Sequence, residues 1–484
     1  MGQDTQDGGV RPSRRHADLG PDFYDVVAPA RFPKTVLRYR NRAWAERVGL
    51  GSLSEAEWIA HFGRFEPLPG SFPEPLALRY HGHQFRSYNP DLGDGRGFLF
   101  AQAYDLRDGR LLDFGTKGSG TTPWSRMGDG RLTLKGGVRE VLATAMLEAL
   151  GVDTSKTFSL IETGEALERG DEPSPTRSSV LVRLSHGHIR IGSFQRCLAL
   201  NRPDLTQRLL DHTIDTHMPA LAAERVEARA EGFLAEVVRR VARTGAQIMA
   251  AGFVHGVLNS DNINVTGESF DYGPWRFLPR FDPGFTAAYF DTGGLYSFAR
   301  QPEALFWNLA RLADCLVPLC PQERLGAALE GYGPALQDGF AQALFRRLGL
   351  APAPQEATDR LVAAFWRFHT EARPPFERVF FDWYGGRASE ARAARSPLAE
   401  AYASEAFAPV RAGFAEVEAA DAGRLAHPYF AGEAPCTMLI DEVEAIWAPI
   451  ADCDDWSLFE GKLAAIARMA EAFGTTPEGL EIAA

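Results

Sequence analysis

Cysteine is scarce in this chain of 484 residues, which holds five, at positions 197, 315, 320, 436 and 453. No two of them have the Cys-x-x-Cys spacing. Five cysteines are too few to cross-link a chain of this length, so we exclude a disulfide framework. We expect most of them to be buried thiols, because free cysteine behaves as a small apolar side chain.

Long apolar runs and an excess of positive charge are also missing. No stretch of about 18 apolar residues occurs, so we expect no membrane span. The net charge is -12, which argues against a nucleic-acid partner bound by a general basic surface. Any polyanion site must therefore be a local pocket of Arg and Lys. No apolar segment follows Arg14-Arg15, so we expect no export signal and a cytoplasmic protein.

The chain changes in character along its length, from strand-like to helix-like. We expect a flexible tail at 1–20, an N-terminal arm at 21–75, a β-rich lobe at 76–200 and a helical lobe with a C-terminal extension at 201–484. Apolar runs and turn residues predict strands at 98–103, 110–117, 157–164 and 179–185. Helical periodicity predicts helices at about 55–62, 138–150, 229–251, 302–318, 334–348, 356–371, 388–418 and 456–473.

The stretch Gly252–Gly273 is unusually rich in His, Asp and Asn between two short apolar runs. It predicts a loop, a β-hairpin at about 263–270 and an acidic turn. Asn262 and Asp271 stand nine positions apart, at the two ends of that hairpin, and could converge on one divalent cation. Mg²⁺ needs few protein oxygens when substrate phosphates supply others. A polar hairpin whose Asn and Asp serve turns is the other interpretation, and this stretch alone leaves both open.

Two features of the β-rich part suit phosphate. Gly93, Gly95 and Gly97 alternate around Arg96 just before a strand, and such a turn lets backbone N–H groups approach phosphate. The same glycines could simply form a hairpin. Lys117 ends a strand and is followed by a long loop that contains Asp129 and Gly130.

Three charged residues of this part have two interpretations each. Glu140, in the first turn of a helix, could form an ion pair with Lys117. Alternatively, it could only interact favourably with the positive end of the helix dipole. Arg183 and Arg190 lie in strand-like apolar segments, which indicates either a buried anion or exposed edge positions.

This order of elements is the layout of protein-kinase-like phosphotransferases. His255 and Asn262 are seven apart, like the His and the metal-binding Asn of H-R-D-x-x-x-x-N, and Asp271-Tyr272-Gly273 stands where D-F-G would. However, Val257 occupies the position of the kinase's catalytic Asp. We therefore predict an α+β, protein-kinase-like bilobal fold without a conventional kinase mechanism.

Several long motifs in one order carry a more specific resemblance. They are YHGHQF, LGDGRG, KGSGTTPWSRMGDGR, VREVLATAMLEALG, VRLSHGHIRIGSF, HGVLNSDN, FDYGPWRFL and DPGF. From about Phe23 to Trp307 the chain resembles the selenoprotein O family of kinase-like protein adenylyltransferases, the YdiU group in bacteria. The resemblance implies a bacterial enzyme that transfers AMP from ATP to Ser, Thr or Tyr hydroxyls of proteins (AMPylation), and it allows self-modification.

The resemblance also assigns roles to residues. Asp261 would accept the proton in place of the missing kinase Asp, and Asn262 and Asp271 would hold Mg²⁺ or Mn²⁺. In this family ATP lies reversed relative to a kinase, so the α-phosphorus faces the acceptor. The nucleotide would contact Gly93, Gly95, Arg96, Lys117, Asp129, Gly130, Arg183, Arg190 and Asp271. Beside a metal ligand, the carboxylate of Asp261 is expected to stay ionised.

The sequence departs from the family pattern in places. Arg86 and Asp91 stand where members commonly have Gly and Gln, and Thr121 replaces an Arg. The C-terminal selenocysteine or Cys pair of some members is absent, as is the family's NPxxxxRN segment. These differences concern acceptor choice, redox control and C-terminal contacts.

Three other functions are compatible with parts of the sequence. The chain could bind nucleotide only as a pseudokinase scaffold, or it could transfer UMP from UTP. The two H-G-H pairs invite a zinc-hydrolase interpretation, with ligands among His81, His83, His186, His188 and His255. Alternation along a strand does not give these histidines tetrahedral closure, which disfavours that third function.

Overall fold

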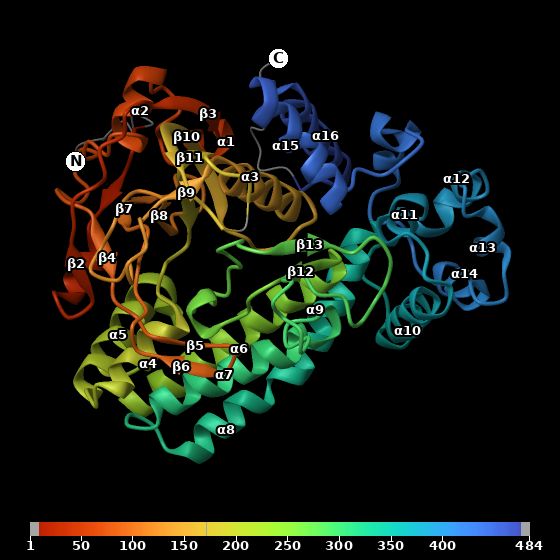
Figure 1. Cartoon of the computed structure of the whole chain (residues 1–484). Coiled ribbons are helices and arrows are strands. Elements are labelled where there is room, and N and C mark those ends of the chain that lie inside the picture. The colour runs from red at the N-terminus through yellow and green to blue at the C-terminus, as the bar shows by residue number, and fades with distance from the viewer. Residues whose placement is uncertain (1–8, 171, 476–484) are drawn as a thin grey trace, which may run out of the picture.

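The computed structural model describes residues 9–170 and 172–475. Among these residues the largest element is a nine-stranded antiparallel sheet, in the upper part of Figure 1. Its strands are β1 (Pro12–Ser13), β2 (Tyr24–Val26), β3 (Val36–Arg40), β4 (Leu76–Leu78), β7 (Leu99–Tyr104), β8 (Leu111–Lys117), β9 (Leu132–Thr133), β10 (Lys156–Leu167) and β11 (Thr176–Ser185). They run in the order β2-β4-β7-β8-β11-β10-β3, with β1 on β7 and β9 on β11.

The four strands predicted from apolar runs are confirmed as β7, β8, β10 and β11. The turn between β7 and β8 includes Asp108 and Gly109, and Gly109 takes a φ of +73° that glycine adopts without strain. In the sheet β8 lies between β7 and β11, with Lys117 opposite Leu181. The centre of the sheet therefore carries Lys117 at the end of β8.

One helix covers the sheet next to these strands. Helix α3 (Leu134–Ala149) begins where the Thr133 side chain accepts a hydrogen bond from Gly136 N–H, at 3.1 Å. It packs on β10 and β11 through buried residues that include Val138, Val141 and Leu142. Its apolar stripe turns Glu140 inward, toward Lys117.

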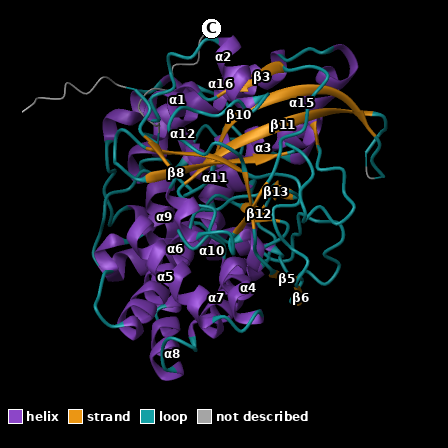
Figure 2. Ribbon diagram, turned by 90° about the vertical axis from the view of Figure 1, so that its left-hand side faces the viewer, coloured by secondary structure: helices purple, strands orange, loops and turns teal. Residues whose placement is uncertain are grey.

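Helices make up most of the rest, below the sheet in Figure 1 and in the lower half of Figure 2. They are α4 (Ile191–Ala199), α5 (Pro203–His217), α6 (Val226–Ala250), α7 (Gln301–Leu316), α8 (Gln322–Glu330), α9 (Tyr332–Arg347) and α10 (Gln355–Ala372). Two short helices, α1 (Arg42–Arg47) and α2 (Glu55–Phe62), belong to the N-terminal arm. Helix α4 packs on α7, so the end of the lobe expected at 76–200 belongs to the helical part.

The His, Asp and Asn-rich stretch is enclosed by two short paired strands, β12 (Phe253–His255) and β13 (Trp275–Phe277). Between them lies a 3₁₀ turn, η3 (Ser260–Asn262). The hairpin predicted at 263–270 is reduced to one isolated bridge, Ile263 to Ser269. A second small pair, β5 (Gly82–Gln84) with β6 (Ser87–Asn89), lies against α4 and η3.

The single helix predicted at 388–418 is wrong. The segment forms α12 (Glu390–Ala393), α13 (Ala399–Ala403) and α14 (Ala408–Phe414) instead. Pro397 and Pro409 explain the breaks, because proline lacks the N–H that continues a helix. Helices α11 (Phe376–Asp382), α15 (Ile440–Cys453) and α16 (Ser457–Phe473) complete this region, and α16 packs on α3.

The flexible tail predicted at 1–20 is wrong for residues 12–19; residues 1–8 lie outside the described part. Strand β1 pairs with β7, and the 3₁₀ helix η1 (Arg15–Leu19) follows it. Leu19 is buried, and His16 N–H donates to Gln102 Oε1 at 2.9 Å. A polar, glycine-rich composition did not reveal these apolar and backbone contacts. The described cysteines are all free, and 197, 315 and 320 are buried as expected.

Candidate active site

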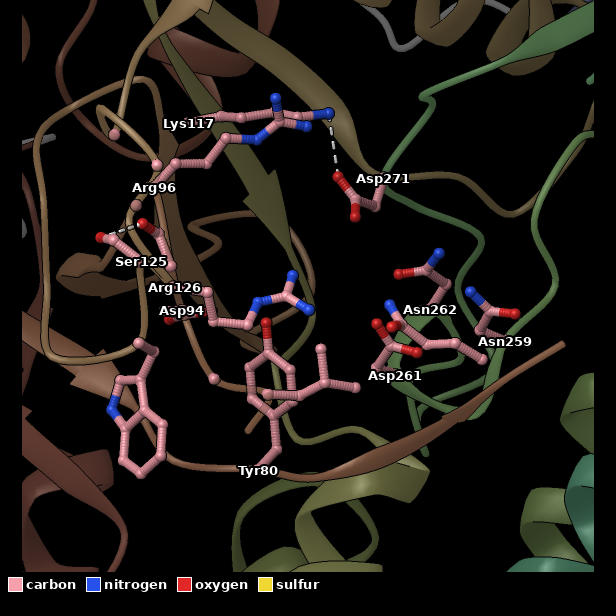
Figure 3. A pocket seen from close by; sticks show the side chains of 18 of the residues that line it. Tyr80, Asp94, Arg96, Lys117, Ser125, Arg126, Asn259, Asp261, Asn262 and Asp271 are labelled. Atoms are coloured by element: carbon pink, nitrogen blue, oxygen red, sulfur yellow. Dashed lines mark hydrogen bonds and ion pairs between the residues drawn. The ribbon is translucent and has the colours of Figure 1, made fainter. Parts of the chain in front are cut away.

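A cavity of about 900 Å³ lies where the sheet faces the loop and 3₁₀ turn of residues 256–262. Figure 3 shows Lys117, Asp261, Asn262 and Asp271 around one space. All eleven residues proposed from the sequence line it: Gly93, Gly95, Arg96, Lys117, Asp129, Gly130, Arg183, Arg190, Asp261, Asn262 and Asp271. Residues far apart in the sequence are thus brought to one place.

Lys117 is the centre of a buried ion-pair chain. Its ammonium contacts Glu140 of α3, as one interpretation of the sequence predicted, and lies 2.9 Å from Asp271 Oδ1. Lys117 and Glu140 are only 4% and 1% exposed. Each of these two buried charges requires the other, because burying an unpaired charge away from water costs free energy of folding.

Asp271 lies near the end of the His, Asp and Asn-rich stretch and faces three cations. Arg183 Nη1 donates to its Oδ1 at 3.1 Å, beside the bond from Lys117. Burial alone would raise the pKa of Asp271, but Lys117, Arg183 and Arg96 together hold that pKa well below its usual range. The residue has a φ of +63°, a left-handed conformation that Asp tolerates better than most residues. Asp271 is therefore an ionised carboxylate at any ordinary pH.

Arg183 and Arg190 are 5% and 3% exposed, so they are not at open strand edges. Arg190 Nη1 donates to Asp94 Oδ1 at 3.0 Å, and its guanidinium lies 4.0 Å from the Tyr80 ring centroid. Two buried guanidinium groups whose planes line one cavity form the kind of local cationic pocket that an acidic protein needs to bind a polyanion.

Asn262 and Asp261 lie side by side in η3. Asn262 Nδ2 donates to the carbonyl oxygen of Val257 at 3.0 Å, which fixes the orientation of the amide and leaves Oδ1 for another partner. Asp271 Oδ1 takes both of its cationic partners, which leaves Oδ2. These two oxygens line the same cavity and are of the type that Mg²⁺ and Mn²⁺ bind.

Asp261 is 8% exposed, and its Oδ1 has no hydrogen-bond partner within the described residues. Burial raises the pKa of Asp261 to about 6, even though Arg190 and Arg126 oppose the rise. The sequence predicted a carboxylate that simply stays ionised. The structure instead gives one that is ionised at pH 7 and lies within about one pKa unit of accepting a proton.

The glycine turn and the loop at 118–131 pack against each other. A Cβ atom on Gly93 would lie 2.4 Å from the Trp124 ring, so only glycine fits there. Trp124 Nε1 donates to Asp25 Oδ2 at 2.9 Å, which ties the loop to the N-terminal arm. Asp129 Oδ2 lies 2.9 Å from Arg169 Nη1, at the cavity rim.

Sequence reasoning missed Tyr80, Asp94 and Trp124. Asp94 stands between two of the glycines, where an Asp is usually read as a turn residue, and Tyr80 and Trp124 look like ordinary apolar positions. Their partners, Arg190 and Asp25, are far away in the sequence. The one signal in the sequence was Arg190 itself, because an Arg in a strand-like apolar segment indicates that an anionic partner lies nearby.

The five histidines of the zinc interpretation do not converge. Each forms a hydrogen bond with a different partner. The pairs are His81 with Tyr88, His83 with Gln195, His186 with Glu268, His188 with Asp113, and His255 with the carbonyl oxygen of Phe270. In the described ranges, one group of three potential ligands occurs, formed by Asp105, Asp108 and His186. Arg47 already contacts both of its carboxylates, so this group forms a salt-bridge cluster.

The chain matches the family model described as protein adenylyltransferase SelO over residues 11–467. It belongs to this family. A protein nucleotidyltransferase YdiU of Gloeobacter violaceus is 45% identical to it over 92% of each chain. Another of the same name, from Trichodesmium erythraeum, is 47% identical over 75% of this chain and 77% of its own. One from Vibrio cholerae is 38% identical over 74% and 71%.

Membership of the SelO family makes the protein an enzyme of the nucleotidyltransferase class. The resemblance seen in the motifs from Phe23 to Trp307 therefore extends over nearly the whole chain. Within the described residues, no helix is both long and apolar enough to cross a membrane.

Proposed function

We propose that the protein transfers AMP from ATP to Ser, Thr or Tyr hydroxyls of other proteins, and of itself, in a kinase-like bilobal fold. The observation that supports this most is the single cavity lined by all eleven expected residues. It combines cations for a triphosphate, oxygens for a divalent metal and one carboxyl with a pKa near neutrality. The family to which the chain belongs is that of protein adenylyltransferase SelO, which agrees with transfer of AMP to proteins.

In the proposed reaction, Asp261 removes the proton of the acceptor hydroxyl. The hydroxyl oxygen then forms a bond to the α-phosphorus of ATP, the bond from that phosphorus to the bridging oxygen breaks, and pyrophosphate leaves. Lys117, Arg183 and Arg190 bind phosphate oxygens and stabilise the charge that develops on them. The missing carboxylate at Val257 supports this role for Asp261, because a kinase base would otherwise stand there.

Asn262 and Asp271 would hold Mg²⁺ or Mn²⁺ through the two oxygens left without protein partners. The metal supplies positive charge that screens the phosphates and orients them. Asp271 keeps its negative charge through its bonds to Lys117 and Arg183, so it is ready to bind a cation. We propose that ATP lies with its α-phosphate toward Asp261 and its remaining phosphates toward the buried arginines, the reverse of a kinase.

The experiment is label transfer from ATP carrying ³²P at the α or the γ position, with Mg²⁺ or Mn²⁺. Acceptors are the protein itself and proteins of a bacterial lysate, and intact mass identifies the added group. We expect label only from α-³²P-ATP and a mass increase of one AMP. Label from the γ position would contradict the proposal, and a stronger signal from α-labelled UTP would change the nucleotide to UMP.

The Asp261→Asn variant separates catalysis from nucleotide binding. It keeps the size of the side chain but cannot accept the proton, so transfer should fall about 100-fold or more while ATP binding persists. Asp282→Asn, the same change at an exposed loop residue outside the cavity, is the control and should match the parent. A parent protein that binds ATP yet transfers no label from either nucleotide would be a pseudokinase scaffold.

A further inference from the structure

A second cavity, of about 430 Å³, borders a different part of the His, Asp and Asn-rich stretch, at Thr266 and Glu268. It is bounded by the β7–β8 turn, the end of α5, one face of α6 and the Thr266 turn between Asn262 and Asp271. No described residue lines both cavities. Its volume is in the range of pockets that bind small metabolites.

The lining of this cavity is cationic in a protein that is acidic overall. Five Arg and Lys residues line it against three acids. Each acid is already bonded within the protein: Asp108 to Arg110, Asp153 to Arg243, and Glu268 to Lys156 and His186. The negative charges are therefore satisfied and leave an excess of positive charge at the cavity surface.

Two arginines supply that excess. Arg239 and Arg240 share one carboxylate, Glu236, which does not line the cavity. Arg240 uses its Nε for this bond, at 2.6 Å. Arg243, one turn further along α6, binds Asp153 through Nη2, and its buried Nε has no partner. Side chains three apart on a helix lie on one face, so the side chains of Arg240 and Arg243 border the same cavity.

Further buried polar atoms in the lining also have no partner in the described part of the chain. They are Thr216 Oγ1, Thr266 Oγ1 and His186 Nε2, and His186 is only 7% exposed. A buried polar atom without a hydrogen bond costs free energy, so native proteins rarely keep several in one place without a ligand or ordered water to bind them. Counting Arg243 Nε, four such atoms belong to residues that line this one cavity.

We propose that this cavity is a second binding site, for a small phosphate-bearing anion. Donors and positive charge exceed the free acceptors in the lining, which matches a ligand rich in acceptor oxygens. Guanidinium groups bind phosphate oxygens with charge-assisted hydrogen bonds, and the two threonine hydroxyls add uncharged donors. The first cavity plays no part in this argument, so the inference stands apart from the proposed AMP transfer.

A ligand in this cavity would contact the segment that carries the proposed metal ligands, because Thr266 lines the cavity. Thr266 belongs to the turn whose two ends carry Asn262 and Asp271. Gly267 packs so closely on α6 that an added Cβ would lie 2.5 Å from Arg240 Cβ. An anion bound by Arg240 and Thr266 would hold that turn against α6.

Crystals of the full chain soaked in tungstate test the location directly. Tungstate is a tetrahedral oxyanion whose tungsten is found by anomalous scattering. We expect a peak between Arg240, Arg243 and Thr266, and its loss in Arg240→Gln/Arg243→Gln. The control is Arg225→Gln, which removes one positive charge from an exposed residue beside the start of α6 and should keep the peak. No peak in the parent, or a peak that survives the double variant, overturns the proposal.

Thermal unfolding in inorganic phosphate tests the site in solution. A ligand of the folded state raises the melting temperature, and the rise grows with the logarithm of the ratio of ligand concentration to Kd. The first cavity is unchanged in all three proteins, so a difference between them reports the second. We expect the double variant to bind phosphate about tenfold more weakly and Arg225→Gln to match the parent. If phosphate raises the melting temperature of all three proteins equally, it does not bind at the second cavity and the proposal is refuted. Neither experiment depends on AMP transfer.

Discussion

Lys117 Nζ lies 2.9 Å from Asp271 Oδ1 and also contacts Glu140. One ammonium group thus joins the central strand of the sheet, helix α3 and the segment between β12 and β13. The ion pairs themselves hold the three charges in position. This pre-organisation is what a site needs if its charges are to stabilise a transition state rather than rearrange around it.

Replacing Lys117 by Met should abolish AMP transfer and also destabilise the fold. Glu140, 1% exposed, would be left as a buried charge without its partner, which costs about 3–5 kcal/mol. Urea unfolding measures this loss. The double variant Lys117→Met/Glu140→Leu removes both charges, so it should recover most of the stability while transfer stays absent. A double variant as unstable as the single one would show that the pair is not the cause.

Removing the amide of Asn262 should weaken the response to metal. Asn262→Leu deletes the free Oδ1, so the Mg²⁺ or Mn²⁺ concentration for half-maximal transfer should rise about tenfold or more. ATP binding in EDTA, measured by calorimetry, should change little. Asn262→Asp keeps an oxygen at the site and should retain a metal response closer to the parent. Equal metal curves for Leu and parent would remove Asn262 from the metal site.

Gly130→Ala should damage the loop at the cavity rim. Gly130 has a φ of +68°, and a Cβ there would lie 2.2 Å from the Gly120 carbonyl oxygen. Strain and displacement of this kind cost about 1–3 kcal/mol, so ATP affinity should fall about tenfold. Gly273→Ala is the matched control, since nothing lies within 4 Å of its added Cβ. Calorimetric titration with ATP distinguishes the two.

Stability should fall as the pH drops from about 6.5 to 4. Burial lowers the pKa of His369 to about 4, so in this range the unfolded chain binds a proton that the folded protein excludes. Between pH 7 and pH 5 this one residue should remove about 2 kcal/mol from the free energy of unfolding. His369 is 0% exposed among aromatic rings, so His369→Phe should fit and should reduce the pH dependence by that amount. An unchanged slope in urea unfolding would contradict this account.

Eleven residues that line the first cavity could be named from the sequence, because their order along the chain resembles that of kinase-like enzymes. A strand Lys, a helix Glu, a His seven before an Asn and an acidic turn can be recognised without contacts. Asp94 and Tyr80 could not be found in this way, because their roles depend on where Arg190 packs. The same limit explains the error at 388–418, where an alanine-rich helical pattern concealed the effect of Pro397 and Pro409.

The pairing of β1 with β7 bears on how shortened forms of the protein will behave. The recognisable motifs begin near Phe23, so a truncation designed from them would delete β1 and η1. The deletion would expose the backbone of Gln102 and Ala103, which pairs with Ser13 and Pro12 in the full chain. It would also expose the side chain of Gln102, which accepts a hydrogen bond from His16 N–H. An exposed strand edge recruits strands from other molecules. We therefore expect such a truncated protein to aggregate, although every residue lining the first cavity would still be present.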